Sequence, residues 1–139
     1  MPPITQGGTV NWNITRLYVE ETAPGAVAPA EILPPGNPFD LKVDFDGSGA
    51  AWTALEMLLA AYTVKFYAER IGAGPSPSEH DLGTVPGALG TGPYTASQTV
   101  AANTLTEGVY RIGCLIEIVP GSGVVGFEEG LVISIASGA

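Results

Sequence analysis

A run of alternating side chains in the last third of the chain constrains the fold more than any other feature. From residue 110 to residue 118, every second side chain is apolar and the residues between them are mixed. The apolar set is Tyr110, Ile112, Cys114, Ile116 and Ile118. Alternation with a period of two, rich in β-branched residues, is typical of a strand with one buried face. We therefore predict a central strand whose apolar face, Cys114 included, lies in the core.

Further apolar runs separated by turn residues predict the rest of the fold. Residues 39–45 and 62–70 alternate in the same way. Residues 94–100 and 124–135 predict further strands, the last with Leu131, Ile133 and Ile135 inward, and residues 81–85 predict a short edge strand. The 19 Gly and 12 Pro lie between these runs and fit many short strands joined by turns. Residues 50–60 are the one helix-like window, because strong helix formers there place apolar side chains at helical spacing.

The predicted fold class is all-β, an antiparallel β-sandwich with one short helix near residues 50–60. A length of 139 residues fits one domain with a core that needs no covalent staple. We assign residues 1–9 to an N-terminal arm and residues 10–139 to a single β-sandwich domain. Residues 21–38 are rich in Pro and Ala, so we expect a long connection or a weak edge strand there.

The step Gly108-Val109-Tyr110 resembles the tyrosine corner that opens a strand in immunoglobulin-like and fibronectin-like sandwiches. The resemblance is architectural, covers roughly residues 10–136, and lacks the paired cysteines of antibody domains. It implies that the ring of Tyr110 is buried and that its hydroxyl bonds to backbone within residues 103–107. Loss of that hydroxyl should lower stability by about 0.5–1.5 kcal/mol.

The charge balance excludes some classes of partner. Five basic residues against 14 acidic ones give a net charge of -9, which disfavours nucleic acid and an anionic membrane surface. No apolar run reaches the roughly 20 residues of a membrane helix, so we expect no membrane insertion. The first residues show no signal-peptide pattern. We expect an intracellular or virion assembly, or a surface protein exported by another route.

Few residues of the sequence suggest a catalytic or a metal-binding site. Asp44 and Asp46 flank a turn that faintly resembles a calcium loop, but no downstream carboxylate closes it, so we predict no metal site. His80 lies between two acidic residues without a nucleophile motif, and Glu128 and Glu129 precede a strand as a hairpin flank. There is no phosphate loop and no cluster of Cys and His. We expect neither catalysis nor a cofactor.

The first strand, residues 10–20, carries apolar side chains on both parities. Three explanations are open: a bulge, a strand that changes sheets, or a strand covered on both sides. The third would suit a neighbouring subunit, and the N-terminal arm has too little apolar surface to order itself. The predicted interface residues are Ile4, Val10, Trp12, Ile14 and Tyr18. Asn13 also begins a glycosylation sequon, whose use the sequence does not decide.

Our leading hypothesis is a non-enzymatic structural subunit, a homo-oligomer that builds a filament, sheath, shell or virion surface. The alternative is a binding module that recognises carbohydrate or protein through exposed aromatic residues. The candidates for that role are Trp12, Tyr18, Tyr67 and Tyr94. An equally weighted explanation is that the helix-like segment or the Pro-rich connection covers these aromatics within the monomer.

Overall fold

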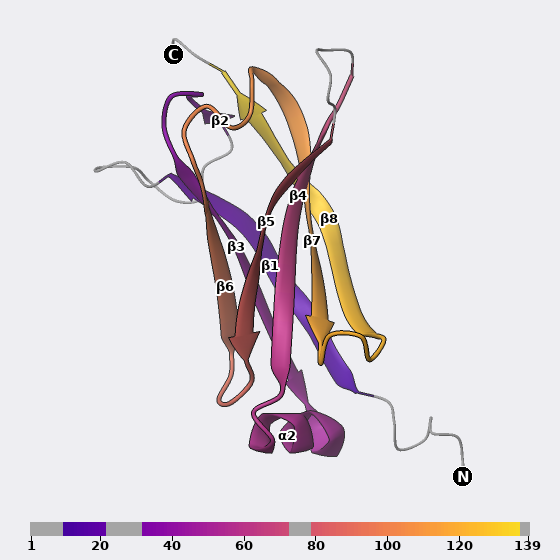
Figure 1. Cartoon of the computed structure of the whole chain (residues 1–139). Helices are drawn as coiled ribbons and strands as arrows, with labels where there is room; N and C mark the ends of the chain where they lie inside the picture. Colours follow the sequence, from indigo (N-terminus) through magenta and orange to yellow (C-terminus); the bar gives the residue numbers. More distant parts are fainter. Residues whose placement is uncertain (1–9, 22–31, 73–78, 137–139) are drawn as a thin grey trace.

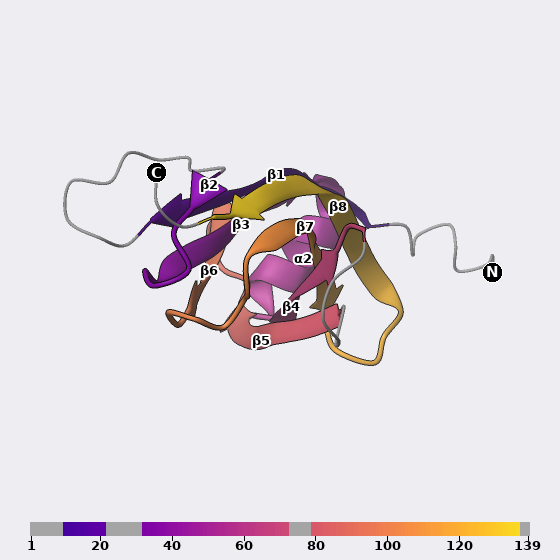
Figure 2. The same ribbon diagram turned by 90° about the horizontal axis from the view of Figure 1, so that it is seen from above.

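Two β-sheets pack face to face (Figures 1 and 2). The apolar side chains of the alternating strands are buried between them. The computed structural model describes residues 10–21, 32–72 and 79–136. One sheet has the strand order β1-β3-β6 and the other the order β2-β8-β7-β4-β5. The elements are β1 (Asn11–Glu21), β2 (Ile32–Leu33), β3 (Phe39–Ser48), α2 (Gly49–Met57), β4 (Ala61–Arg70), β5 (Glu79–Ala88), β6 (Tyr94–Val100), β7 (Gly108–Ile118) and β8 (Val124–Ile135). The all-β prediction and the short helix are confirmed.

Strand β7 is the middle strand of the five-stranded sheet, as the alternation predicts. It pairs antiparallel with β4 on one side and with β8 on the other. Its inward side chains are completely buried, and so are the predicted inward residues of β3 and most of those of β4. The alternating pattern was sufficient to identify the buried face of β7, because β7 is paired along its length with β4 and β8, two strands of similar length.

A bulge explains the apolar residues on both parities of β1. The register between β1 and β3 shifts between Ile14 and Arg16. Residues on either side of the shift therefore face the same core: Trp12 and Ile14 before it, Leu17 and Val19 after it. The bulge, and not a cover on the second face, accounts for this pattern.

Two edge elements differ from the expectation. Strand β2 pairs with β8 in parallel, so the five-stranded sheet is mixed and not purely antiparallel. Leu33 of β2 is buried and its carbonyl accepts a hydrogen bond from Ala136 N–H, which ties this end of the long connection to the core. Strand β5 is longer than the predicted residues 81–85, because an edge strand has one side free and tolerates Pro86.

Helix α2 covers one end of the sandwich, beside the β7–β8 hairpin and the start of β1 (Figure 1). Trp52 is its only buried residue, and its ring stacks on Trp12 with centroids 6.0 Å apart. The ring of Tyr94 packs against the Trp52 ring in a T-shaped arrangement, with centroids 6.0 Å apart. Trp52 is therefore the main contact of the helix with the core, and the partly buried Leu55 packs against the same core. No helix within the described residues is long and apolar enough to span a membrane.

The corner at Tyr110 has the expected geometry. Its side chain is fully buried, and its hydroxyl donates a hydrogen bond of 2.9 Å to the carbonyl oxygen of Thr106. The guanidinium of Arg70 donates to the same hydroxyl at 2.9 Å and to Thr106 Oγ1 at 2.7 Å. The prediction of a buried Tyr110 bonded to backbone within residues 103–107 is confirmed, and the sequence analysis missed the contribution of Arg70.

We expect Cys114 to react with a thiol reagent only after unfolding. The thiol is buried on the inner face of β7, and this burial, with a smaller contribution from Glu128, raises its pKa to about 12. At about pH 8, where an ordinary thiol is partly ionised, the native protein has almost no thiolate to react. Labelling followed by mass spectrometry, with and without denaturant, measures this. Rapid labelling of the native protein, or a disulfide-linked dimer, would contradict it.

Candidate functional site

Among the residues that the structure describes, the large apolar side chains that remain exposed lie on two surfaces. Five belong to the outer face of the five-stranded sheet: Ile32, Val109, Val125, Phe127 and Val132. Ile71 follows β4 directly and its N–H bonds to the carbonyl of Val109, so we include it with these five in what we call the sheet face. The other four lie at the end of the sandwich that α2 covers: Met57, Leu58, Leu59 and Val119. Where such side chains form a contiguous patch, they usually mark a contact with another molecule.

The outer face of the three-stranded sheet is polar by comparison, and its side chains bond to one another. Thr95 and Thr99 of β6 donate hydrogen bonds to Asp44 and Asp40 of β3, at 2.7 and 2.6 Å. Lys42 forms an ion pair of 2.6 Å with Glu20 of β1. A face whose polar groups are paired in this way is well suited to solvent. Within the described residues, the exposed large apolar side chains lie instead on the sheet face and at the α2 end.

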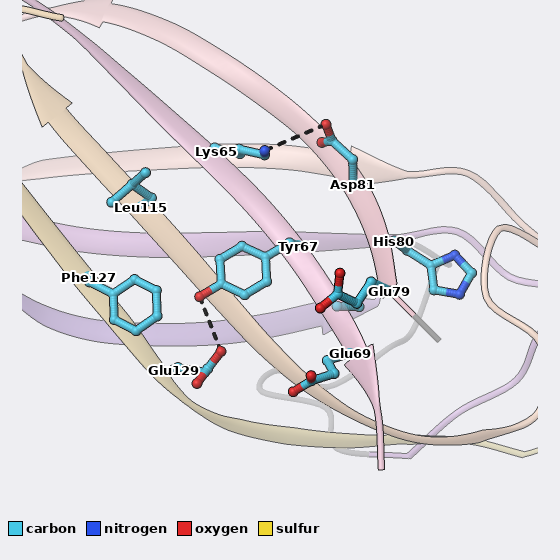
Figure 3. Close-up of a pocket in the computed structure, with 10 residues that line it drawn as sticks. Lys65, Tyr67, Glu69, Glu79, His80, Asp81, Leu115, Phe127 and Glu129 are labelled. Atoms are coloured by element: carbon cyan, nitrogen blue, oxygen red, sulfur yellow. Dashed lines mark hydrogen bonds and ion pairs between the residues drawn. The ribbon is translucent and has the colours of Figure 1, made fainter. Parts of the chain in front are cut away.

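A hollow of about 500 Å³ lies on the sheet face over β4, β5, β7 and β8 (Figure 3). We call it the aromatic pocket. The rings of Tyr67 and Phe127 stack beside each other with centroids 6.1 Å apart and planes inclined by 22°. Its full lining is Lys65, Tyr67, Ala68, Glu69, Glu79, His80, Asp81, Leu115, Phe127 and Glu129. The pocket thus has an apolar centre and an acidic rim.

Local sequence explains the position of the aromatic pair. Gly113 of β7 lies opposite Tyr67 of β4, and a Cβ atom at position 113 would collide with the Tyr67 ring. The missing side chain lets the ring lie flat on the backbone of β7. Phe127 of β8 is in register with Leu115 of β7, which places it next to the same ring. The register between β4 and β5 also shifts between Phe66 and Tyr67, at the position where the hollow lies.

The electrostatics of the aromatic pocket are acidic. Tyr67 Oη donates a hydrogen bond of 3.2 Å to Glu129 Oε2, and burial, followed by the charge of Glu129, raises the pKa of Tyr67. Lys65 lies 4.0 Å from Asp81, at the limit of an ion pair. Neither Glu79 nor Glu129 forms an ion pair with a described residue. The rim therefore keeps an excess of negative charge.

The predicted interface residues are not gathered on one exposed surface. Val10, Trp12 and Ile14 pack against the core of their own domain, and Ile4 lies outside the described residues. Tyr18 is half-buried on the polar face, with the guanidinium of Arg16 3.9 Å above its ring. Trp12 and Ile14 do line a second hollow of about 280 Å³ together with residues 125–128 of β8. The structure includes no neighbouring subunit, so the contact itself stays a prediction.

Of the four aromatic candidates for ligand binding, Tyr67 lines the aromatic pocket and Trp12 lines the smaller hollow. Tyr94 is a core residue with 7% of its surface exposed, and α2 covers Trp12 through Trp52. Tyr18 lies on the polar face, so Tyr67 is the one of the four that lines the larger hollow. The explanation that the helix covers some aromatics within the monomer therefore holds for Trp12 and Tyr94.

Phe127, the other half of the aromatic pair, was missed because of a second bulge. Leu131, Ile133 and Ile135 pack inward or against the core as predicted, and extending their parity would place Phe127 inward as well. The register between β7 and β8 shifts between Ile112 and Cys114, and this reverses the parity of β8. The signal that was available is the sequence Glu128-Glu129-Gly130, because a Gly inside a strand often marks a bulge.

The residues considered for chemistry do not form a site. Asp44 accepts hydrogen bonds from Tyr18 and Thr95, and Asp46 accepts one from the Gly47 N–H. His80 packs edge-on against the buried ring of Tyr110 and points away from the other side chains of the pocket (Figure 3). Within the described residues, no group of three or more His, Cys, Asp or Glu side chains is arranged to hold a metal ion.

Comparison with known proteins gives no family for this chain. No protein-family model matches it, and no curated protein matches it either.

Proposed function

We propose that this protein is a non-enzymatic structural subunit that assembles with copies of itself into a filament, sheath, shell or virion surface. One observation carries the proposal: the exposed large apolar side chains are segregated onto the sheet face and the α2 end, while the opposite face is polar. Such segregation is expected of a domain whose apolar surface is covered in an assembly.

The apolar surface is large enough to matter energetically. Full burial of one Val, Leu, Ile, Phe or Met side chain contributes about 1.5–3 kcal/mol. Association costs roughly 4–15 kcal/mol in lost translational and rotational freedom. All ten of the exposed large apolar side chains in the described part of the chain are of these types. Burial of half of them offsets the lower part of that cost.

The N-terminal segment is part of the proposal as a second contact. In the described part of the chain, β1 is an edge strand that pairs with β3 alone, so its other edge is open to strand addition. Residues 1–9 precede this strand directly and include Ile4. A variant that lacks residues 1–8 should stay folded by circular dichroism and assemble less well than the full chain.

We expect assembly to strengthen with salt. A net charge of -9 makes copies repel one another, and salt screens repulsion between exposed charges while it leaves apolar contacts intact. Light scattering after size-exclusion chromatography, at about 0.05 M and about 0.5 M NaCl, should show larger species at the higher concentration. Negative-stain imaging of the same samples gives their form. A chain that stays monomeric under both conditions and at high protein concentration would contradict the proposal.

A second candidate function has one specific observation in its favour. The stacked Tyr67 and Phe127, flanked by Glu129 and Glu79, combine an aromatic platform with acceptors for hydroxyl groups, an arrangement suited to carbohydrate or to a protein side chain. A binding module of this kind would be monomeric and would show saturable ligand binding that is lost in Phe127→Ala. The chromatography above separates the two candidates.

A further inference from the structure

The end of α2 carries three consecutive exposed apolar side chains, which we call the apolar tip: Met57, Leu58 and Leu59. Their exposed fractions are 79, 77 and 65%. We propose that subunits join head to tail, with the apolar tip of one copy seated in the aromatic pocket of the next. This inference rests on the proposed function and adds the two surfaces that meet.

The apolar tip is held in place by its backbone. Leu58 N–H bonds to the carbonyl of Ala54, Leu59 N–H to that of Glu56, and Ala60 N–H to that of Leu55. Leu59 adopts a left-handed conformation with φ of 53°, in a position where helices usually end in Gly. A leucine there displays a large apolar side chain at the cost of backbone strain. The exposure of the tip is thus fixed by the fold, as a preorganised contact requires.

The aromatic pocket has a matching floor. Tyr67, Leu115 and Phe127 form its apolar centre, and its volume of about 500 Å³ lies within the roughly 300–1,000 Å³ of sites that enclose a ligand. The pocket lies along β4 at Tyr67, six residues after the strand begins beside the tip. At about 3.3 Å per residue, tip and pocket of one copy are roughly 20 Å apart. A contact between them therefore joins two molecules.

The charges select this pairing over contact between two sheet faces. A symmetric face-to-face dimer would bring Glu79, Glu117 and Glu129 of both copies onto one acidic patch. From residue 57 to residue 64 the chain has no charged residue, and the nearby carboxylate of Glu56 accepts a hydrogen bond from the Tyr94 hydroxyl. The apolar tip is the exposed apolar surface that enters an acidic-rimmed pocket without adding a carboxylate to it.

A head-to-tail contact leaves each pair with one free tip and one free pocket. Such contacts close into a ring when the rotation between copies allows it and otherwise continue as a filament. Face-to-face contact, by comparison, stops at a dimer. The two geometries therefore differ in how single-surface variants behave.

Two variants test the apolar tip and the aromatic pocket independently. Leu58→Asp disables the apolar tip and Phe127→Asp disables the aromatic pocket, and both positions are exposed, which limits the effect on folding. At a concentration where the wild type assembles, each variant alone should be monomeric by light scattering, with the threshold for assembly raised at least about tenfold. An equal mixture should form one-to-one dimers that grow no further, because each dimer has one working tip in one working pocket.

Matched controls add the same charge elsewhere. Thr53→Asp on α2 and Ser97→Asp on the polar face are exposed positions and should assemble like the wild type. A mixture of Leu58→Cys with Phe127→Cys should also give a disulfide-linked heterodimer on oxidation, whereas Thr53→Cys with Phe127→Cys should not.

The outcomes distinguish this inference from the proposed function. If the wild type assembles and either Asp variant assembles equally well, or if the mixture stays monomeric, the head-to-tail contact is wrong while self-assembly stands. A wild type that remains monomeric at every concentration overturns both.

Discussion

Trp52→Ala should lower the free energy of unfolding by about 3–5 kcal/mol, the range typical of a buried aromatic residue replaced by alanine. The side chain is 1% exposed and contacts both Trp12 and Tyr94. Its removal leaves a cavity between α2 and the sheets that neighbouring rings fill only in part. Denaturant unfolding followed by circular dichroism measures the change.

The lost stability should come from the contact between α2 and the sheets, because Trp52 is the one fully buried residue of α2. Trp52→Phe should recover more than half of it: a ring remains, and the indole Nε1, which is buried without a hydrogen-bond partner among the described residues, is removed. Thr53→Ala, at an exposed position of the same helix, should change stability by less than about 0.5 kcal/mol. A Trp52→Ala variant as stable as the Thr53→Ala control would show that α2 does not pack as described.

The alternating strands were the predictable part of the fold. In β3, β4 and β7 the side chains keep one parity from end to end, so hydrophobicity alone identifies the buried face. Arg70 was within reach of the same argument: it occupies the next inward position after Ala68, and a buried arginine needs a partner such as Tyr110.

The bulges were the part that could not be predicted. A bulge depends on which residues face each other across two strands, and that register is absent from a single run of sequence. In β1 the bulge lets apolar residues of both parities face the same core. The strand therefore needs no cover on its outer face, which was the reason for choosing Val10, Trp12 and Ile14 as interface residues. In β8 it exposed Phe127, and with it the aromatic pocket.

The apolar tip was hidden for a related reason. Leu59 stands at helical spacing from Trp52 and Leu55, so the pattern places it on the buried side of a helix that continues through residue 59. The helix instead ends at Met57, and the left-handed turn at Leu59 directs the chain into β4. Sequence periodicity does not show where a helix stops when no Gly or Pro marks its end.

Tyr110→Phe should lower the free energy of unfolding by about 1–3 kcal/mol. This is more than the loss of the bond to the Thr106 carbonyl alone would cause, because Arg70 bonds to the same hydroxyl. The phenol donates to the Thr106 carbonyl and accepts from the buried guanidinium of Arg70. Without the hydroxyl the Thr106 carbonyl loses this donor, and a charged group with 7% exposure loses an acceptor. Hydrogen bonds that involve a buried charge are worth more than neutral ones.

Tyr18→Phe provides the matched control for this substitution. The Tyr18 hydroxyl also has a polar partner, Asp44, but at 3.5 Å and on a half-buried outer face where water replaces the lost bond. We expect a change below about 0.5 kcal/mol for that variant. Urea titrations of both variants, with the slope of the transition checked to be unchanged, give the comparison. Equal midpoints for the two variants would mean that the hydroxyl of Tyr110 is replaceable by solvent, and the Arg70–Tyr110–Thr106 cluster would then not be the stabilising element of this corner.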